Sequence, residues 1–231
     1  SFPLQSVASY QLCFLGCLDM VAVPFGWNVV IVGAWNVAIL TPDGIRRRLF
    51  QLPDQATIEV DVAIDRLAPF RVRHDGLIVV PSSSMLEIST EVLDLPSLLK
   101  AGEIGVRALA SLPETPLAAA VINVRYRLFD IPDDLWDLIG CSLDDALSDA
   151  GHTIKRRAVS RSLLLHPGEV NIELSYGDET DSKLNFNFNL ESPQHQELQQ
   201  WLARANEFFS ISQTLLSTMK VQNAEGGEGN D

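Results

Sequence analysis

Apolar residues between Ser192 and Lys220 recur every three or four positions, the spacing that places side chains on one face of a helix. Ser192 is a suitable N-cap, and Pro193 then occupies the first helical position, where its missing N–H costs nothing. The apolar stripe is wide and includes the aromatic residues Trp201 and Phe208. The pattern therefore predicts one long amphipathic C-terminal helix that covers a sheet or another subunit.

Most of the chain before this helix shows the short apolar runs and the alternation that are typical of β-strands. Turn-forming residues separate the runs, and the strongest turns are predicted at Thr41–Gly44 and at Asp75–Gly76. Strands in the first half are predicted over residues 4–18, 28–40 with a bulge at Gly33, 45–52, 57–64, 71–74, 77–80 and 85–92. These segments predict an antiparallel meander.

The second half begins after a helix predicted over residues 95–112, which Pro113–Pro116 ends. Strands are then predicted over residues 117–129, 153–165, 169–176 and 183–190, and two short helices over 132–139 and 142–150. Residues 221–231 are rich in Gly, Glu and Asn, a composition that predicts a disordered acidic tail.

Together these elements predict an α+β fold: an antiparallel sheet of about eight or nine strands with helices on one face. The chain lacks the regular alternation of strands and helices that a parallel sheet requires. We expect residues 1–220 to form a single domain. The alternative is two similar halves, 1–112 and 117–220, each with several strands followed by a helix.

The chain has 231 residues, 46% of them hydrophobic, and a formal net charge of −13. This acidity argues against binding to nucleic acid or to an anionic membrane surface. The uncharged run from residue 20 to residue 42 is long enough to cross a bilayer, but Pro24, Gly26 and Gly33 interrupt it, and buried strands explain it better. The three cysteines, Cys13, Cys17 and Cys141, predict no disulfide framework and favour a reducing, cytoplasmic setting.

No common catalytic, nucleotide-binding or metal-binding motif occurs in the chain. The four histidines are far apart in the sequence, and the pairs Asp133–Asp134 and Asp144–Asp145 fit the first turns of predicted helices. We therefore predict no catalytic residue, no metal site and no cofactor.

Arginine pairs two residues apart are the clearest candidates for a binding site. Arg71 with Arg73 and Arg125 with Arg127 lie on predicted strands, where each pair points to one face. Arginine suits bidentate contact with a carboxylate or a phosphate, so these four residues predict a face that binds an anion. The competing interpretation is that they form cross-strand ion pairs with acids on neighbouring strands, such as Glu59, Asp61, Glu87, Glu169 and Glu173.

The sequence therefore favours a non-enzymatic binding or assembly protein. Its partner would be another protein or a second copy of the chain in a homo-oligomer, bound at an apolar groove or at a sheet edge. The alternating asparagines of strand 183–190 fit either such an edge or, more commonly, a strand with one face exposed. The alternative function is an enzyme or binder that acts on a small anionic ligand through the strand arginines.

Overall fold

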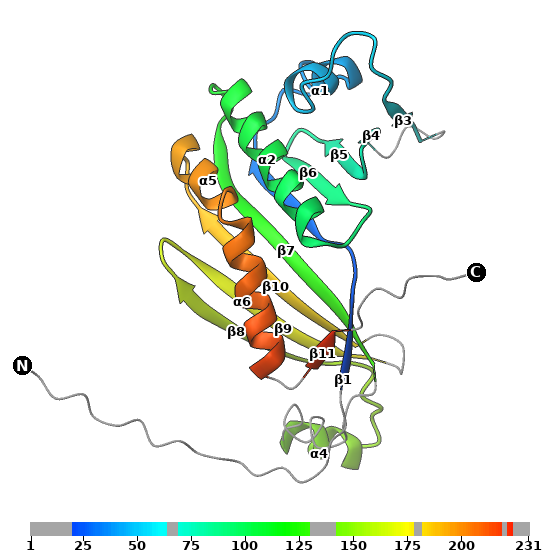
Figure 1. Ribbon diagram of the computed structural model, residues 1–231. Helices are drawn as coiled ribbons and strands as arrows, with labels where there is room; N and C mark the ends of the chain where they lie inside the picture. Colours follow the sequence, from blue (N-terminus) through cyan, green and yellow to red (C-terminus); the bar gives the residue numbers. More distant parts are fainter. Residues whose placement is uncertain (1–19, 64–68, 130–141, 178–181, 219–220, 224–231) are drawn as a thin grey trace, which may run out of the picture.

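The computed structural model describes residues 20–63, 69–129, 142–177, 182–218 and 221–223 (Figure 1). In these residues the chain has the predicted α+β fold, built on one open sheet. The strands are β1 Met20–Pro24, β2 Asn28–Gly33, β3 Glu59–Asp61, β4 Arg71–His74, β5 Leu77–Pro81, β6 Met85–Thr90, β7 Leu117–Phe129, β8 Arg157–Leu165, β9 Gly168–Tyr176, β10 Lys183–Glu191 and β11 Val221–Asn223. The helices are α1 Pro42–Arg48, α2 Leu95–Ser111, α4 Ser142–Asp149, α5 His195–Leu202 and α6 Ala205–Thr218.

Strand β7 forms the centre of the sheet. One side of β7 pairs with β10, while the other side pairs with β2 along its first half and with β1 along its second half. The main strand order is β3-β4-β5-β6-β2-β7-β10-β9-β8. All of these neighbours are antiparallel, and the short β11 adds a parallel pair with β1. The two ends of the main order are therefore β3 and β8.

The same order of elements occurs twice along the chain. In the first half, β2 is followed by α1, by the short additional strand β3, by the meander β4-β5-β6 and by α2. In the second half, β7 is followed by α4, by the meander β8-β9-β10 and by α5 with α6. In each half the last strand of the meander pairs with the first strand of the half, and β2 joins β7. The two sets of elements thus form one continuous sheet.

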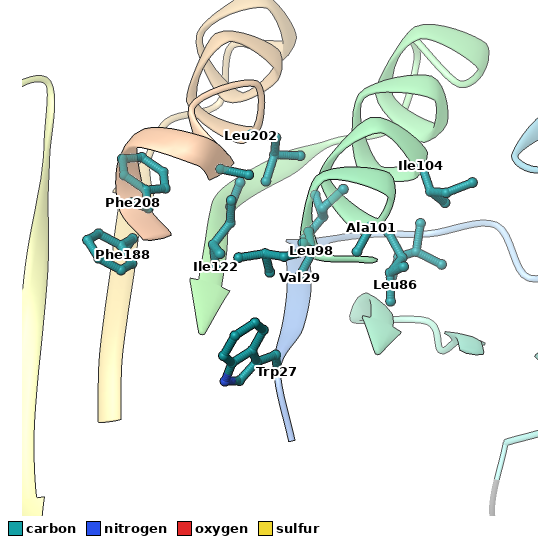
Figure 2. Close-up of a cluster of buried hydrophobic side chains, with 14 of the residues drawn as sticks. Trp27, Val29, Leu86, Leu98, Ala101, Ile104, Ile122, Phe188, Leu202 and Phe208 are labelled. Carbon is teal, nitrogen blue, oxygen red and sulfur yellow. The ribbon is translucent and has the colours of Figure 1, made fainter. Parts of the chain in front are cut away.

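Helices α2, α5 and α6 pack on one face of this sheet, with α2 over β2 and β6 and with α5 and α6 over β7. Figure 2 shows the core between these layers, where Leu98 and Ala101 of α2 lie near Val29 and Leu86 of the strands. Under α5 and α6, the ring of Phe208 stacks on Phe188 with 4.6 Å between centroids. We call the opposite face of the sheet the polar face.

Close approach explains the two glycines that weaken the helical pattern of α2. A Cβ on Gly105 would lie 2.8 Å from Leu202 Cδ1, and a Cβ on Gly102 would lie 3.0 Å from the carbonyl oxygen of Leu202. Glycine costs a helix about 1 kcal/mol relative to alanine. Here it allows α2 to lie against α5, and the predicted helix over residues 95–112 is confirmed as α2.

The predicted turn at Thr41–Gly44 and the predicted strand over residues 45–52 are wrong, because this segment forms α1. Thr41 is the N-cap, its side chain accepts a hydrogen bond from the Gly44 N–H, and Pro42 occupies the first turn. The same Thr-Pro-Asp-Gly sequence suits a turn or a helix start. The side chain of Arg46 is buried and contacts Asp43 at 2.6 Å and Asp54 at 3.1 Å.

Other boundaries also differ from the pattern. The strand predicted over residues 28–40 ends at Gly33, where the register with β7 shifts as the predicted bulge requires. The C-terminal segment is helical as predicted but divides into α5 and α6. Ser192 is not the N-cap: Gln194 is, and the Ser192 hydroxyl oxygen accepts a hydrogen bond from the Gln194 N–H at 3.0 Å.

Two short strands, β1 and β11, are not among the predicted ones. β1 lies in the uncharged run, which contains β1 and β2, and no helix of the described segments is long and apolar enough to cross a membrane. β11 takes up the first three residues of the predicted tail. The strand predicted over residues 4–18, the helix predicted over 132–139 and all three cysteines lie outside the described residues.

Candidate functional site

The four predicted anion-binding arginines lie on the polar face of the sheet, but in two separate places. A continuous row of paired residues crosses from β4 to β7, through Arg73, Ile78, Ser89, Asn28 and Asn123. Because alternate residues share a face, Arg71 and Arg73 point to the same side as Arg125 and Arg127. Strands β4 and β7 are four spacings of about 4.8 Å apart, or about 19 Å, so the two pairs do not form one site.

The contacts of Arg73 agree with the competing interpretation, in which the strand arginines form ion pairs. Its Nε lies 2.7 Å from Asp61 Oδ2 on the neighbouring β3, and its Nη1 contacts Glu91. The hydrogen bond to Asp61 raises the pKa of Arg73. Arg71 is exposed and lies opposite Asp61 in the register of β3 and β4. Arg73 is therefore engaged by two carboxylates at the β3–β4 edge, whereas no ion pair joins Arg71 to a described residue.

Arg125 and Arg127 are different, since neither forms a salt bridge with a described residue. Arg125 is half-buried, and its Nη1 donates to the carbonyl oxygen of Gly26 at 2.6 Å. Burial lowers the pKa of Arg125, while the charge of Glu87 acts in the opposite direction. The guanidinium of Arg127 lies over the ring of Phe25, 5.3 Å from its centroid. Both cations keep donors that can reach an anion from the polar face.

A row of asparagines crosses the polar face beside Arg125. Asn187 Nδ2 donates to Asn123 Oδ1 at 2.8 Å, and Asn123 Nδ2 donates to Asn28 Oδ1 at 2.9 Å. Asn28 Nδ2 then donates to Glu87 Oε1 at 2.7 Å. Asn28 and Asn123 are buried, so this row satisfies polar groups within the sheet. Beside it, the buried Oδ1 of Asn185 has no hydrogen-bond partner among the described residues.

The asparagine-rich strand is not a sheet edge, and its alternating burial agrees with the other interpretation, a strand with one face in the core. β10 carries Asn185, Asn187 and Asn189, and it pairs with β7 on one side and with β9 on the other. Its alternating pattern arises because one face packs under the helices, while the asparagines of the other face lie on the polar face of the sheet. The edge is two strands further out, at β8.

β8 is a nine-residue strand that pairs with β9 and, among the described strands, with no other. Seven of its residues run from Ala158 to Leu164, and all of them except Val159 are exposed. Leu163 and Leu164 are 44% and 87% exposed. Long, exposed edge strands with apolar residues are sites where another strand can add to a sheet.

The connection to β9 determines which backbone groups of β8 point away from β9. Only two residues separate Leu165 from its partner Gly168, so this pair exchanges both of its hydrogen bonds. Hydrogen-bonded and non-hydrogen-bonded pairs alternate along an antiparallel ladder. The N–H and C=O groups that point away from β9 therefore belong to Ala158, Ser160, Ser162 and Leu164.

Arginines border this free edge. Arg161 Nη1 donates to the outward carbonyl oxygen of Ser160 at 2.8 Å, so its exposed guanidinium lies beside the free backbone. Arg157 contacts Asp144 of α4 at 2.7 Å, and Arg156 contacts Glu173 of β9 at 3.2 Å. Arg161 thus keeps donors for a partner, whereas the other two have carboxylate partners.

The hollows between the described elements show no comparable arrangement. The depression beside α5, about 410 Å³ in volume, is lined by Trp201 and Arg204 among others. Arg204 is held there by two hydrogen bonds to Glu207, at 2.8 and 2.7 Å, and its guanidinium carbon lies 5.0 Å from the centroid of the Trp201 ring. No group of three or more His, Cys, Asp or Glu side chains among the described residues is placed to hold a metal ion.

Sequence reasoning missed the β8 edge, although the signal is present. Residues 155–165 contain four basic residues and no acid, and they end in three consecutive leucines before a two-residue turn. An inner strand of an antiparallel sheet alternates apolar and polar residues because one of its faces packs on the core. Residues 155–165 lack this alternation, so neither face of the strand is marked as the core face. No model of a known protein family matches the chain, and no curated protein sequence matches it.

Proposed function

We propose that this chain is a non-enzymatic binding protein that takes up an extended segment of a partner protein as an additional strand beside β8. One observation carries this proposal: β8 presents the outward N–H and C=O groups of Ala158, Ser160, Ser162 and Leu164 with no described strand beside them. Backbone hydrogen bonds of this kind supply affinity in β-augmentation, and side chains on alternate positions supply specificity.

The β8 edge lacks most of the features with which proteins protect free edges. Such features are proline, a bulge, a very short strand and charged side chains, of which β8 has only the charges of Arg157 and Arg161. β8 contains no proline, its register with β9 is continuous over nine pairs, and it ends in exposed leucines. By contrast, the opposite edge strand β3 has three residues, two of them acidic.

The proposal is tested by selecting binders from a random nine-residue peptide library and measuring their affinity for two variants. Ser162→Pro removes one outward N–H and leaves the hydrogen bonds to β9 intact. Ser162→Ala is the matched control, because both variants lose the hydroxyl that donates to Asn171. We expect selected peptides to bind the wild type and Ser162→Ala alike and to bind Ser162→Pro at least tenfold more weakly. Selected peptides that bind all three proteins equally would refute the proposal.

A second copy of the chain is another partner that the same edge accepts, and a homo-oligomer remains a prediction. Light scattering over a concentration series measures it directly. An oligomer that Ser162→Pro converts to a monomer would assign the edge to self-association. An oligomer that this variant leaves intact would place the contact elsewhere. The expected cytoplasmic setting likewise remains a prediction.

A small anionic ligand is a second candidate function, favoured by the absence of any salt bridge to Arg125 and Arg127 from described residues. A thermal shift assay with millimolar phosphate tests it. We expect phosphate to raise the melting temperature of the wild type and of Arg48→Ala, an exposed arginine on α1, but not of Arg125→Ala. The absence of any shift in the wild type would contradict it.

A further inference from the structure

The side chains along β8 restrict which segment the edge can accept. Resting on the proposed function, we infer that the β8 edge selects an acidic extended segment, with carboxylates over Arg161 and larger apolar side chains over Ser160 and Ser162. The inference concerns the chemistry of the partner and does not depend on the identity of the protein that carries the segment.

Two faces of β8 offer different surroundings to an incoming strand. Arg157, Val159, Arg161 and Leu163 alternate with Ala158, Ser160, Ser162 and Leu164, so the first set shares the side of the helices and the second shares the polar face. Side chains directly opposite on paired strands have Cβ atoms about 5 Å apart. An incoming residue on the helix side therefore meets a cation or an apolar group, and one on the polar face meets mostly small side chains.

Arg161 gives the helix side its charge preference. It is exposed, and its only described contact is the 2.8 Å hydrogen bond from Nη1 to its neighbour's carbonyl oxygen. A carboxylate on the incoming strand can accept two hydrogen bonds from this guanidinium, a geometry that arginine favours. No acidic residue lies between residues 153 and 168 to compete with it.

Charge also argues against a second β8 strand as the preferred occupant. In an antiparallel pair of β8 strands centred on Ser160–Ser162, the two Arg161 side chains share one face, opposite or diagonal to each other. Like charges in such positions are destabilising. An acidic segment removes this repulsion and replaces it with attraction, so complementarity favours the acidic partner.

The net charge of the whole chain predicts the opposite preference, for basic peptides. At −13, the protein repels acidic peptides and attracts basic ones when only its overall field acts. A preference for an acidic peptide therefore requires a local basic site. This expected preference is opposite in sign to that of non-specific binding.

Three fluorescein-labelled peptides test the inference by anisotropy at physiological salt. The first alternates valine and glutamate over nine residues, the second alternates valine and lysine, and the third is the acidic peptide with two valines replaced by proline. We expect the acidic peptide to bind at least tenfold more tightly than the basic one. The proline peptide should lose this binding, because it cannot form the strand ladder.

Variants of the protein locate the binding. Arg161→Glu should reverse the preference between acidic and basic peptides, while Arg48→Glu, the same charge change at an exposed position of α1, should leave it unchanged. Ser162→Pro should weaken the acidic peptide at least tenfold, and Ser162→Ala should not. Circular dichroism confirms that each variant is folded.

The possible results distinguish a failure of the acidic preference from a failure of the proposed function. Acidic and basic peptides that bind equally, both sensitive to Ser162→Pro, would overturn the acidic preference and keep the proposed function. An acidic peptide that binds equally to Ser162→Pro would overturn the assignment of acid binding to β8. No measurable binding of the acidic peptide would overturn the inference, and the library selection would then decide the proposed function.

Discussion

Gly168 lies directly against Trp201: a Cβ atom on Gly168 would come within 2.8 Å of Trp201 Cη2. Gly168 is the first residue of β9 and follows the turn from β8, while Trp201 is buried in α5 and donates from Nε1 to the carbonyl oxygen of Phe188 at 3.3 Å. This contact fixes the β8–β9 hairpin against the helical layer. The free edge of β8 is therefore held by a packed core, although the strand itself is exposed.

Gly168→Ala should lower the free energy of unfolding by about 1–3 kcal/mol, because the added methyl group forces the Trp201 ring or the β10 backbone to move. Urea denaturation measures this change. Ser160→Ala, on the exposed part of the same hairpin, is the matched control and should change stability by less than about 0.5 kcal/mol. Equal stability of the two variants would show that the Gly168–Trp201 contact is not tight.

The asparagine row makes a second prediction about stability. Asn123→Leu leaves the Oδ1 of Asn28 and the Nδ2 of Asn187 without their partners. Because unsatisfied polar groups at buried positions cost about 1–3 kcal/mol each, we expect a loss of about 2–4 kcal/mol in urea denaturation. Asn185→Leu on the same face is the control, since its Oδ1 already lacks a described partner, and it should cost about 1 kcal/mol or less. A larger loss of stability in Asn185→Leu than in Asn123→Leu would contradict the stabilising role of the asparagine row.

Tyr126 predicts how stability changes at high pH. Burial raises the pKa of Tyr126 from its usual value of 10.0 to about 12. The folded state therefore holds the phenol proton more tightly, so this contribution is complete below pH 10 and is lost as the pH rises from about 10 to about 12. Over this range the wild type should lose up to about 2–3 kcal/mol that Tyr126→Phe does not lose. Urea denaturation of both proteins from pH 9 to 11.5 measures the difference, and parallel curves would contradict the assignment.

The sequence predicts an element well where one face of the element is buried and the opposite face is exposed, because this arrangement produces a periodic pattern. β7 and α2 match their predicted ranges closely, because one face of each is buried and the other is not. Thr41–Arg48 misleads because a helix N-terminus and a turn use the same residues. β1 and β11 are too short to show a period. β1 is recognised as a strand by its pairing with the end of β7, and β11 by its pairing with β1.

The candidate site was harder to predict than the fold, since it depends on strand order. The sequence places Arg71, Arg73, Arg125 and Arg127 on strand faces, but only the sheet shows that Asp61 and Glu91 occupy Arg73. Alternation in β10 resembles that of an edge strand, although Asn187 donates a hydrogen bond across the sheet to Asn123 of β7. β8 is the edge because no described strand pairs with its outer side, and the lack of alternation over residues 155–165 is the only local sign of this position.

The direction of the free backbone groups predicts an alternating pattern of amide exchange along β8. The N–H groups of Val159, Arg161 and Leu163 point to β9 and should exchange slowly, whereas those of Ser160 and Ser162 should exchange rapidly. Residue-resolved hydrogen exchange by NMR measures both sets in one experiment. Uniform protection along the strand would mean that another segment already covers the edge.

The most direct test of the central claim repeats this exchange measurement in the presence of a library-selected peptide at saturation. If the peptide adds as a strand, the outward N–H groups of Ala158, Ser160, Ser162 and Leu164 become protected, while those that bond to β9 change little. Protection that appears elsewhere on the chain while these four amides still exchange rapidly would contradict the account.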